Sequence, residues 1–447
     1  MSIISDIESF SPGAKKFLGF SAINLISWQC IVGQFLVLFG RSIGMPASWV
    51  GTLVSFIPLS MLLVIFSVPI VEQYGSKKVM MVTWMLRNLA VIPVLTIPWL
   101  IPIWGERSAW YVLMLSTFGF SLARATGVAA WYPWIHELVP KRLMGKYLSV
   151  ESSIMQTMNV LVIFAIAKVL GMVEYSNRFY YVYSTGIVAG VVSSFYILTI
   201  PGGVASISTD THNGRFSAIM AVTKDPKYCK FMLLAILSMS SFVWLNVSSI
   251  LCLRDVLKQS DFNIMVLYAI GAIGVALSIR LVSHLAGKMK SQKSLTLMLL
   301  FQGIISASWF FLVSGSSLVP YLVIPVVALG TISAVVIFIF ASQQMLGLVK
   351  QEHKVGYTSV WVIGTSISTG LPPIMAGWFI NHLDLLGYQF CFGISSISAL
   401  VGAWFWYRFN LDERDQFYEL QPHIRHFQPM RSLQRLVWIV LGTNRKK

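Results

Sequence analysis

The sequence predicts an all-α integral membrane protein with about twelve membrane-spanning helices in two six-helix halves. Three observations lead to this fold class. Of the 447 residues, 56% are hydrophobic and only 11% are charged, which is more apolar surface than a soluble fold of this size buries. Long apolar runs alternate with short basic clusters along the chain. One long polar connection divides these runs into two sets of six.

Each apolar run is long enough to cross a bilayer once, because a hydrocarbon core about 30 Å thick needs about 20 helical residues. The runs lie at 17–40, 48–71, 79–103, 109–134, 144–171, 178–200, 228–253, 262–284, 294–314, 319–343, 355–380 and 387–409. The first run is as long as the others, so it is interpreted as a retained span and not as a cleaved signal peptide.

The lysines and arginines outside the spans are distributed unequally between the two membrane faces. Roughly 24 of them lie at one set of span ends or in the C-terminal tail, against five at the opposite ends. The positive-inside rule therefore places both termini in the cytoplasm. We expect a multi-pass protein of a cell membrane, either a plasma membrane or a bacterial inner membrane.

The chain is expected to have four segments. These are an N-terminal half (1–200), a cytoplasmic linker rich in Ser, Thr, Gly and Asp (201–227), a C-terminal half (228–409) and a basic cytoplasmic tail (410–447). A weak internal repeat supports two halves, because LVPKRLMGKYLSV at Leu138 and LVKQEHKVGYTSV at Leu348 share five residues in register. Each copy joins the fourth and fifth spans of its half. Duplicated halves are typical of transporters that bind solute near the midplane.

The loop after the second span carries a recognisable motif. It reads EQYGSKKVMM, with an acid at Glu72, a glycine at Gly75 and a basic pair at Lys77 and Lys78. With twelve spans in two halves, this loop resembles the signature of the major facilitator superfamily of secondary transporters, and the resemblance covers nearly the whole chain. It implies alternating access by rocking of the two halves, with the first, fourth, seventh and tenth spans lining the path.

The physical chemistry of this loop is compatible with a gate. A carboxylate at a helix end can pair with cations or with a helix N-terminus and so stabilise one conformation. Glu72, Gly75, Lys77 and Lys78 are therefore expected to form a gating or charge network. The alternative is a solvated loop in which Glu72 lies beside two lysines.

Arg124, in the fourth span, is the first candidate for contact with solute. A guanidinium in the middle of a bilayer costs roughly 2.5–3.5 kcal/mol on insertion scales, so it should face a partner or a wet cavity. Glu151 in the fifth span lies at a similar depth. Two readings are open: a structural Arg124–Glu151 ion pair, or a cavity cation that meets solute. Arg87 in the third span could join the same network or extend toward the membrane surface.

Other path candidates are uncharged and lie in the spans that the resemblance assigns to the path. They are Trp28 and Gln29 in the first span, Trp244 and Asn246 in the seventh, and Thr331 in the tenth. Of the first-span residues Trp28 has the better depth, while Gln29 and Gln34 point elsewhere around the helix. The alternative for each is an interhelical hydrogen bond or a packing contact.

The expected function is transport of a small solute, secondary active or facilitative, with a preference for anionic or polar organic compounds because arginines outnumber acids within the spans. The alternatives are efflux of hydrophobic compounds and a non-transporting receptor or scaffold. No HExxH, GxSxG or P-loop motif is present, so neither an enzyme nor an ATP-driven pump is expected. Facilitated diffusion or exchange is expected, with symport through Glu151 as the alternative.

The expected partners are the solute, membrane lipids and, in a coupled mechanism, an ion or counter-substrate. The four cysteines show neither CxxC nor Cys/His ligand spacing, so no metal site, cofactor or disulfide is expected. Nucleic acid is not expected either, because the cations form short clusters between spans and no continuous basic face. A monomer is expected.

Overall fold

A computed structural model describes residues 10–140, 143–172, 177–205, 222–286, 291–314, 319–349 and 354–409, together with Ile7 and Met220. Most of the predicted linker and the whole predicted tail lie outside these residues. Within the described ranges the chain is helical and has no strand. The helices are α2 (Pro12–Ile31), α3 (Gln34–Ser42), α4 (Ala47–Ser60), η1 (Met61–Leu63), α5 (Val64–Tyr74), α6 (Ser76–Ala90), η2 (Ile92–Thr96), α7 (Ile97–Trp104), α8 (Glu106–Val128), α9 (Trp131–Leu138), α10 (Met144–Met172), α11 (Arg178–Ile197), α13 (Pro226–Asp255), α14 (Asp261–Ala286), α15 (Ser291–Val313), α16 (Val319–Leu348) and α17 (Lys354–Arg408).

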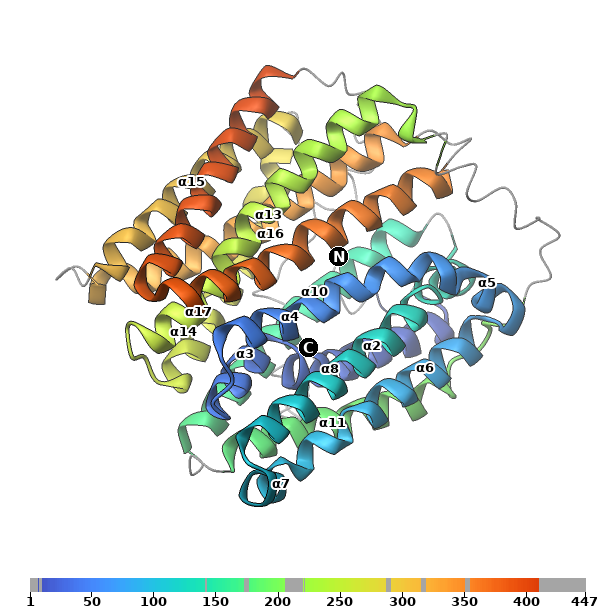
Figure 1. Cartoon of the computed structure of the whole chain (residues 1–447). Coiled ribbons are helices and arrows are strands. Elements are labelled where there is room, and N and C mark those ends of the chain that lie inside the picture. The colour runs from blue at the N-terminus through green and yellow to red at the C-terminus, as the bar shows by residue number, and fades with distance from the viewer. Residues whose placement is uncertain are drawn as a thin grey trace, which may run out of the picture.

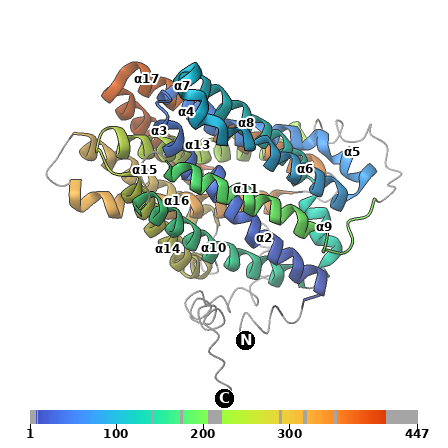
Figure 2. The same ribbon diagram turned by 90° about the horizontal axis from the view of Figure 1, so that it is seen from below.

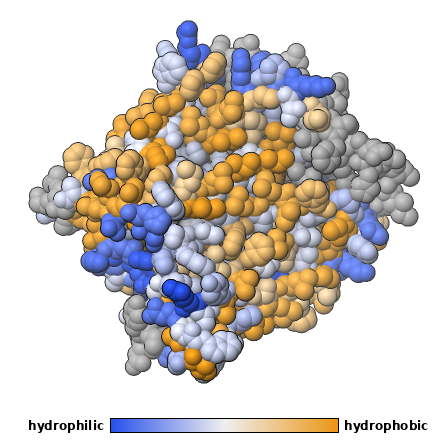
Figure 3. Space-filling model, viewed as in Figure 1, coloured by the Kyte–Doolittle hydropathy of each residue, from blue (hydrophilic) through white to orange (hydrophobic). Residues whose placement is uncertain are grey.

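Nine helical stretches in the described ranges are long and apolar enough to cross a membrane, and α4 with α5 forms a tenth if that pair, bent by 63°, is one span. Helix α17 has 55 residues and breaks at Asp384, where φ is 47°, so its two arms are separate spans. With α11, which has 20 residues, this arrangement reaches the predicted twelve. Figure 3 shows a broad apolar area across one face, with hydrophilic residues toward its margins. The multi-pass, all-α membrane fold is confirmed.

The helices form two groups, which Figure 1 shows side by side. The first group runs from α2 to α11 and the second from α13 to α17. Two pairs of helices make the main contacts between them, α4 with α17 and α10 with α14. Glycines allow α4 and α17 to approach closely: a Cβ on Gly51 would lie 2.1 Å from the carbonyl oxygen of Pro373, and one on Gly377 would lie 2.4 Å from that of Ala47.

Side-chain contacts define the two ends of the helix bundle. At one end, here called the linker end, Lys16 Nζ donates to the carbonyl of Thr199 at 2.9 Å, so the start of α2 meets the end of α11. At the other end, here called the far end, Trp110 Nε1 donates to the carbonyl of Ile43 at 3.0 Å. The first helix of each group therefore runs from the linker end to the far end.

The first predicted span is broken in the middle. Helix α2 ends at Ile31 and α3 begins at Gln34. Gly33 occupies the break, where a Cβ would lie 2.3 Å from Oε1 of Gln29. Because the helix is interrupted, α3 does not continue the angular phase of α2. Side chains beyond residue 33 therefore point in directions that a continuous helix would not give.

Candidate functional site

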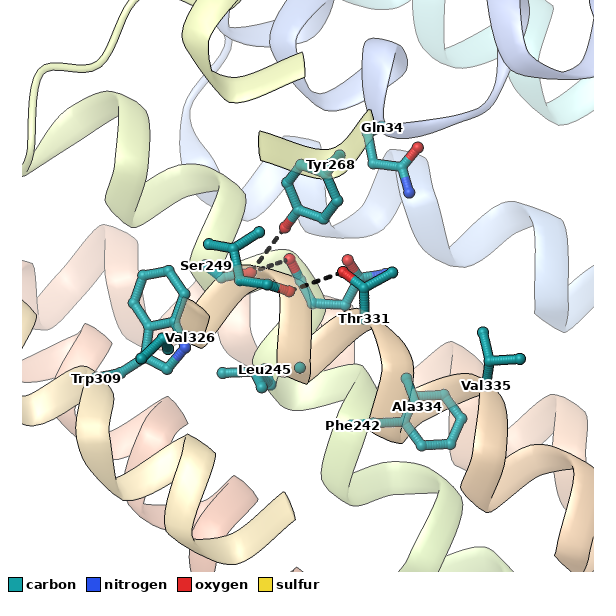
Figure 4. Close-up of a pocket in the computed structure, with 13 residues that line it drawn as sticks. Gln34, Phe242, Leu245, Ser249, Tyr268, Trp309, Val326, Thr331, Ala334 and Val335 are labelled. Atoms are coloured by element: carbon teal, nitrogen blue, oxygen red, sulfur yellow. Dashed lines mark hydrogen bonds between the residues drawn. The ribbon is translucent and has the colours of Figure 1, made fainter. Parts of the chain in front are cut away.

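A cavity of about 190 Å³ lies between the two groups of helices. We call it the interface cavity (Figure 4). The first group contributes Gln34 of α3, and the second group contributes residues of α13, α14, α15 and α16. The polar and aromatic lining residues are Gln34, Phe242, Asn246, Ser249, Tyr268, Trp309 and Thr331. Aliphatic side chains and Gly330 complete the lining.

The hydroxyl groups in the cavity are bonded to the protein. Ser249 Oγ donates to the carbonyl of Asn246 at 2.9 Å and lies 2.9 Å from the hydroxyl oxygen of Tyr268. Because a serine hydroxyl has a single hydrogen, Tyr268 must be the donor in the second bond. Thr331 Oγ1 donates to the carbonyl of Val327 at 2.9 Å. These hydroxyls therefore offer lone pairs to the cavity, while their hydrogens are already used.

Two buried polar atoms of the lining have no hydrogen-bond partner among the described residues. They are Oε1 of Gln34 and Nε1 of Trp309. Trp309 is only 1% exposed, and Figure 4 shows its indole nitrogen on the ring edge that faces the other lining residues. A buried polar atom without a partner costs about 1–3 kcal/mol. A bound polar solute would provide the missing partners.

The structure places only part of the predicted path at this cavity. Asn246 and Thr331 line it. Trp244 is buried and packs against Phe379 of α17, with ring centroids 6.1 Å apart. Gln29 donates to Asn159 Oδ1, which ties α2 to α10. Trp28 lies closer to the linker end, beneath Arg124.

Sequence reasoning missed the role of Gln34. On a continuous helix this side chain points away from the face of Trp28, whereas the break at Gly33 turns it toward the second group. The glycine in the middle of an apolar span was the available signal. Ser249, Tyr268 and Trp309 were also missed, because isolated polar or aromatic residues in the seventh, eighth and ninth spans do not differ from packing residues in sequence.

Arg87 and Arg124, the two arginines within the predicted spans of the first group, lie against aromatic rings. The guanidinium carbon of Arg124 is 4.4 Å from the centroid of Trp28. That of Arg87 is 4.9 Å from the centroids of both Trp84 and Phe120. The rings of Trp28 and Phe120 are 6.4 Å apart, so the two guanidiniums lie on adjoining rings. We call these five residues the arginine–aromatic cluster.

Polar neighbours complete this cluster. Arg87 is 1% exposed and donates from Nη2 to Oδ1 of Asn24 at 2.9 Å. Arg124 Nη1 lies 3.2 Å from the sulfur of Met61. Among the described residues no carboxylate forms an ion pair with either guanidinium. In the described part of the chain, the positive charge of the cluster is therefore stabilised by aromatic rings, an amide oxygen and a thioether sulfur.

The Arg124–Glu151 ion pair, one of the two readings of the sequence, is wrong for this structure. Oε1 of Glu151 accepts from Ser21 Oγ of α2 at 3.0 Å. Arg124 instead lies over Trp28. The sequence argument matched the depths of the two residues, but depth does not fix the direction around each helix. Glu151 faces the buried Ser21, and Arg124 faces the junction of α2 with η1.

The loop of the sequence motif is tied to the first group. Lys77 Nζ donates to the carbonyls of Leu198 and Ile200 at 2.9 and 2.7 Å, which caps the end of α11. Gly75 has φ of 83°, and a Cβ there would lie 2.6 Å from the backbone nitrogen of Ala205. Lys78 Nζ lies 5.4 Å from the ring centroid of Tyr74. Glu72 is half-buried near the end of α5. A gating role for these residues remains a prediction.

The far end carries ion pairs that join the two groups. Arg41 Nη2 lies 2.9 Å from Asp255 Oδ2, and Tyr388 OH donates to the same carboxylate at 3.1 Å. Asp261 of the second group pairs with Arg178 of the first and with Arg254, the latter at 3.3 Å. We call these six residues the far-end network. In the sequence its arginines were interpreted only as signals of orientation.

Within the ranges that the structure describes, no cluster of three or more His, Cys, Asp or Glu side chains is placed to hold a metal ion.

Comparison with solved structures identifies the fold. The nucleoside transporter NupG aligns over 89% of this chain and 99% of its own, with 11% identity and a TM-score of 0.67. A bacterial homologue of the iron transporter ferroportin in its inward-facing state aligns over 89% and 98%, with 14% identity and a TM-score of 0.70. The D-xylose-proton symporter aligns over 89% and 97%, with 12% identity and a TM-score of 0.63.

These similarities show that the chain has the fold of major facilitator superfamily transporters. The outward-facing state of the ferroportin homologue gives a TM-score of 0.61 at the same 14% identity, so the present structure is more similar to the inward-facing state. No protein-family profile and no curated protein sequence matches the chain.

Proposed function

We propose that this protein is a secondary transporter that moves a small polar organic solute across a membrane by alternating access. The observation that carries the proposal is the position of the interface cavity. It lies between two groups of helices, near a far end that ion pairs hold closed across the interface. Breaking those pairs while the linker ends approach each other would give the cavity access to the other side.

The positive-inside rule supports placing the linker end in the cytoplasm. The present conformation is then inward-facing, in agreement with the greater similarity to the inward-facing ferroportin homologue. We also propose that the protein is a monomer surrounded by lipid in a plasma membrane or a bacterial inner membrane, and that it has no enzymatic activity.

The cavity and the arginine–aromatic cluster lie at different depths. Gln34 is eight residues from the far end of α3 at Ser42, or about 12 Å at about 1.5 Å per residue. Arg124 is 18 residues from the far end of α8 at Glu106, or about 27 Å on the same basis. The cluster therefore lies nearer the linker end, where its positive charge favours anionic or neutral polar solutes over cations.

Efflux of hydrophobic compounds is less well supported. The cavity is smaller than the roughly 300 Å³ at which pockets for drug-sized ligands begin, and it holds two buried polar atoms that have no partner in the part of the chain that the structure describes. A large apolar compound would leave both atoms unpaired. A receptor or scaffold would not need a polar cavity between the helix groups.

The test combines transport with cross-linking. Purified protein in liposomes is screened for counterflow of labelled solutes, in a variant that lacks the four native cysteines. Cysteines are then placed at Arg41 and Asp255 and joined by a short bifunctional reagent with a cleavable bond. Transport that stops on joining and returns on cleavage is expected. Transport that continues while the far end is joined would contradict alternating access through this interface.

A further inference from the structure

We infer that the interface cavity selects an uncharged solute that carries several hydrogen-bond donors and at least one acceptor. This rests on the proposed function, because it names the class of solute for the same cavity. The count of charges in the spans favours anions as much as neutral compounds, whereas this inference names neutral compounds alone. The lining of the cavity gives a more local criterion.

No charged side chain is among the residues that line the cavity. An ionised group that leaves water for such surroundings loses its hydration and gains no countercharge, which is costly. A neutral polar solute loses less, since hydrogen bonds alone can replace its contacts with water.

The hydroxyl groups of the lining act as hydrogen-bond acceptors. The hydroxyl hydrogens of Ser249 and Thr331 are donated to backbone carbonyls, and that of Tyr268 goes to Ser249. Their oxygens are left as acceptors, together with Oε1 of Gln34, which has no partner among the described residues. Such oxygens attract O–H and N–H groups. The lining therefore favours a solute that carries several donors.

The lining also supplies donors, among them the side-chain amide of Gln34. Nε1 of Trp309 is a donor only and has no partner in the described part of the chain. The amide of Asn246 lies at the cavity and can donate as well. A solute that satisfies Trp309 must carry an acceptor, such as a carbonyl, a hydroxyl oxygen or a ring nitrogen.

The charges toward the linker end of the cavity disfavour a cation. Toward the far end, Arg41, Arg178 and Arg254 face the carboxylates of Asp255 and Asp261. Toward the linker end, Arg87 and Arg124 lie without a carboxylate in ion-pair contact among the described residues. A cation would therefore enter a region of positive potential.

Binding is tested on the whole protein in detergent by thermal stabilisation with a library of small polar compounds. The library includes series that share a skeleton and differ in charge, such as nicotinamide, nicotinate and 1-methylnicotinamide, or glycerol, glycerate and 3-amino-1,2-propanediol. We expect the stabilising compounds to be neutral. Stabilisation only by anions or cations, or by no compound at millimolar concentration, would overturn the inference.

Variants then locate the binding site. Gln34→Met and Trp309→Phe each remove one hydrogen bond to solute, so each is expected to weaken the affinity of a neutral compound about tenfold. Gln34→Glu keeps an acceptor oxygen and should weaken the affinity for the neutral compound less than Gln34→Met does. Gln344→Met is the matched control, because Gln344 is also buried and without a hydrogen-bond partner among the described residues but does not line the cavity. Affinity that Gln34→Met and Trp309→Phe leave unchanged would refute the site.

Transport separates this inference from the proposed function. If a neutral compound binds at Gln34 and Trp309 but does not cross the liposome membrane, the solute class stands and the transport proposal fails. If an anion is transported, needs Arg124 and is insensitive to both cavity variants, transport stands and the solute class is wrong.

Discussion

Arg41 of α3 and Asp255 at the end of α13 form an ion pair of 2.9 Å that joins the first group of helices to the second at the far end. The two residues are 214 positions apart in the sequence. Both side chains are about a quarter exposed, 25% for Arg41 and 22% for Asp255, so water weakens the pair without removing it. Such a pair can hold one conformation and still break during a transport cycle.

Removing this pair should loosen the far end. Exposed or partly exposed ion pairs contribute about 0.2–1 kcal/mol, so Arg41→Gln should raise the population of the opened far end by a factor of about 1.4 to 5. The measurement is the rate at which a membrane-impermeant reagent labels Ala47→Cys. Ala47 is 5% exposed in the contact between α4 and α17. The native cysteines are removed first.

The exposed Arg107, at the same end, provides the control. Arg107→Gln should leave the labelling rate unchanged, and the charge exchange Arg41→Asp with Asp255→Arg should restore it in part. Equal labelling in the Arg41 and Arg107 variants would mean that the Arg41–Asp255 pair does not hold the far end closed.

A larger effect is expected at Asp261. This side chain is 5% exposed and forms ion pairs with both Arg178 and Arg254. Breaking a buried ion pair from one side costs about 3–5 kcal/mol, because the remaining charge stays buried and unpaired. Asp261→Asn should therefore lower the melting temperature in detergent clearly more than Asp255→Asn. A smaller loss from Asp261→Asn than from Asp255→Asn would contradict this order.

The close approach of α4 to α17 at glycine positions leads to a separate prediction. A methyl group at Gly377 would lie 2.4 Å from the carbonyl oxygen of Ala47, a backbone atom that cannot rotate away. Gly377→Ala should push the groups apart at a cost of about 1–3 kcal/mol, with faster labelling at the far end. Gly347→Ala is the matched control, since nothing lies within 4 Å of its Cβ position. A similar response of both variants would argue against a tight contact at Gly377.

The fold could be predicted from the sequence because the bilayer imposes it. Span length follows from membrane thickness and orientation from basic loops, and neither depends on side-chain packing. The predicted third span, 79–103, corresponds to α6, η2 and α7 together, which run from Ser76 to Trp104. The prolines Pro93 and Pro98 account for its interruption. Even here the boundaries were correct within several residues.

The site was harder to predict because it depends on the direction in which each side chain points. Asn246 and Thr331 were named by span and depth, and both line the cavity. Gln34 was assigned to another face, because a continuous helix was assumed through Gly33. The pairing of Arg124 with Glu151 failed for the same reason. Contacts between groups, such as Arg41 with Asp255, require the packing of helices far apart in sequence.

The orientation of the chain can be tested directly. The excess of lysine and arginine at the linker end predicts that Lys77, Lys146, Thr209, Lys290, His353 and the C-terminus lie in the cytoplasm, with Gly105 and Gly315 outside. Cysteine labelling in intact cells, with and without permeabilisation, measures this. Finding Thr209 on the same side as Gly105 would contradict the division into two six-helix halves.

The last prediction concerns energy coupling and the role of Glu151 in it. The sequence favoured facilitated diffusion or exchange on the premise that an arginine holds this carboxylate as a permanent partner. The structure removes the premise, since Glu151 accepts from Ser21 and forms no ion pair with Arg124. Among the acids placed within the predicted spans, Glu151 is the one that could change its protonation during transport. The contacts of Glu151 therefore support proton symport better than they support facilitated diffusion or exchange.

The measurement is uptake of a transported solute into liposomes under an imposed proton gradient and, separately, a sodium gradient. If Glu151 carries the proton, the proton gradient should drive accumulation by the wild type, and Glu151→Gln should abolish accumulation while leaving exchange of labelled for unlabelled solute intact. Ser21→Ala serves as a matched control, because it removes the hydrogen bond and keeps the carboxylate. Equal accumulation by the wild type and Glu151→Gln would show that another group couples transport. Exchange that responds to neither gradient would instead support the expectation from the sequence, which is facilitated diffusion or exchange.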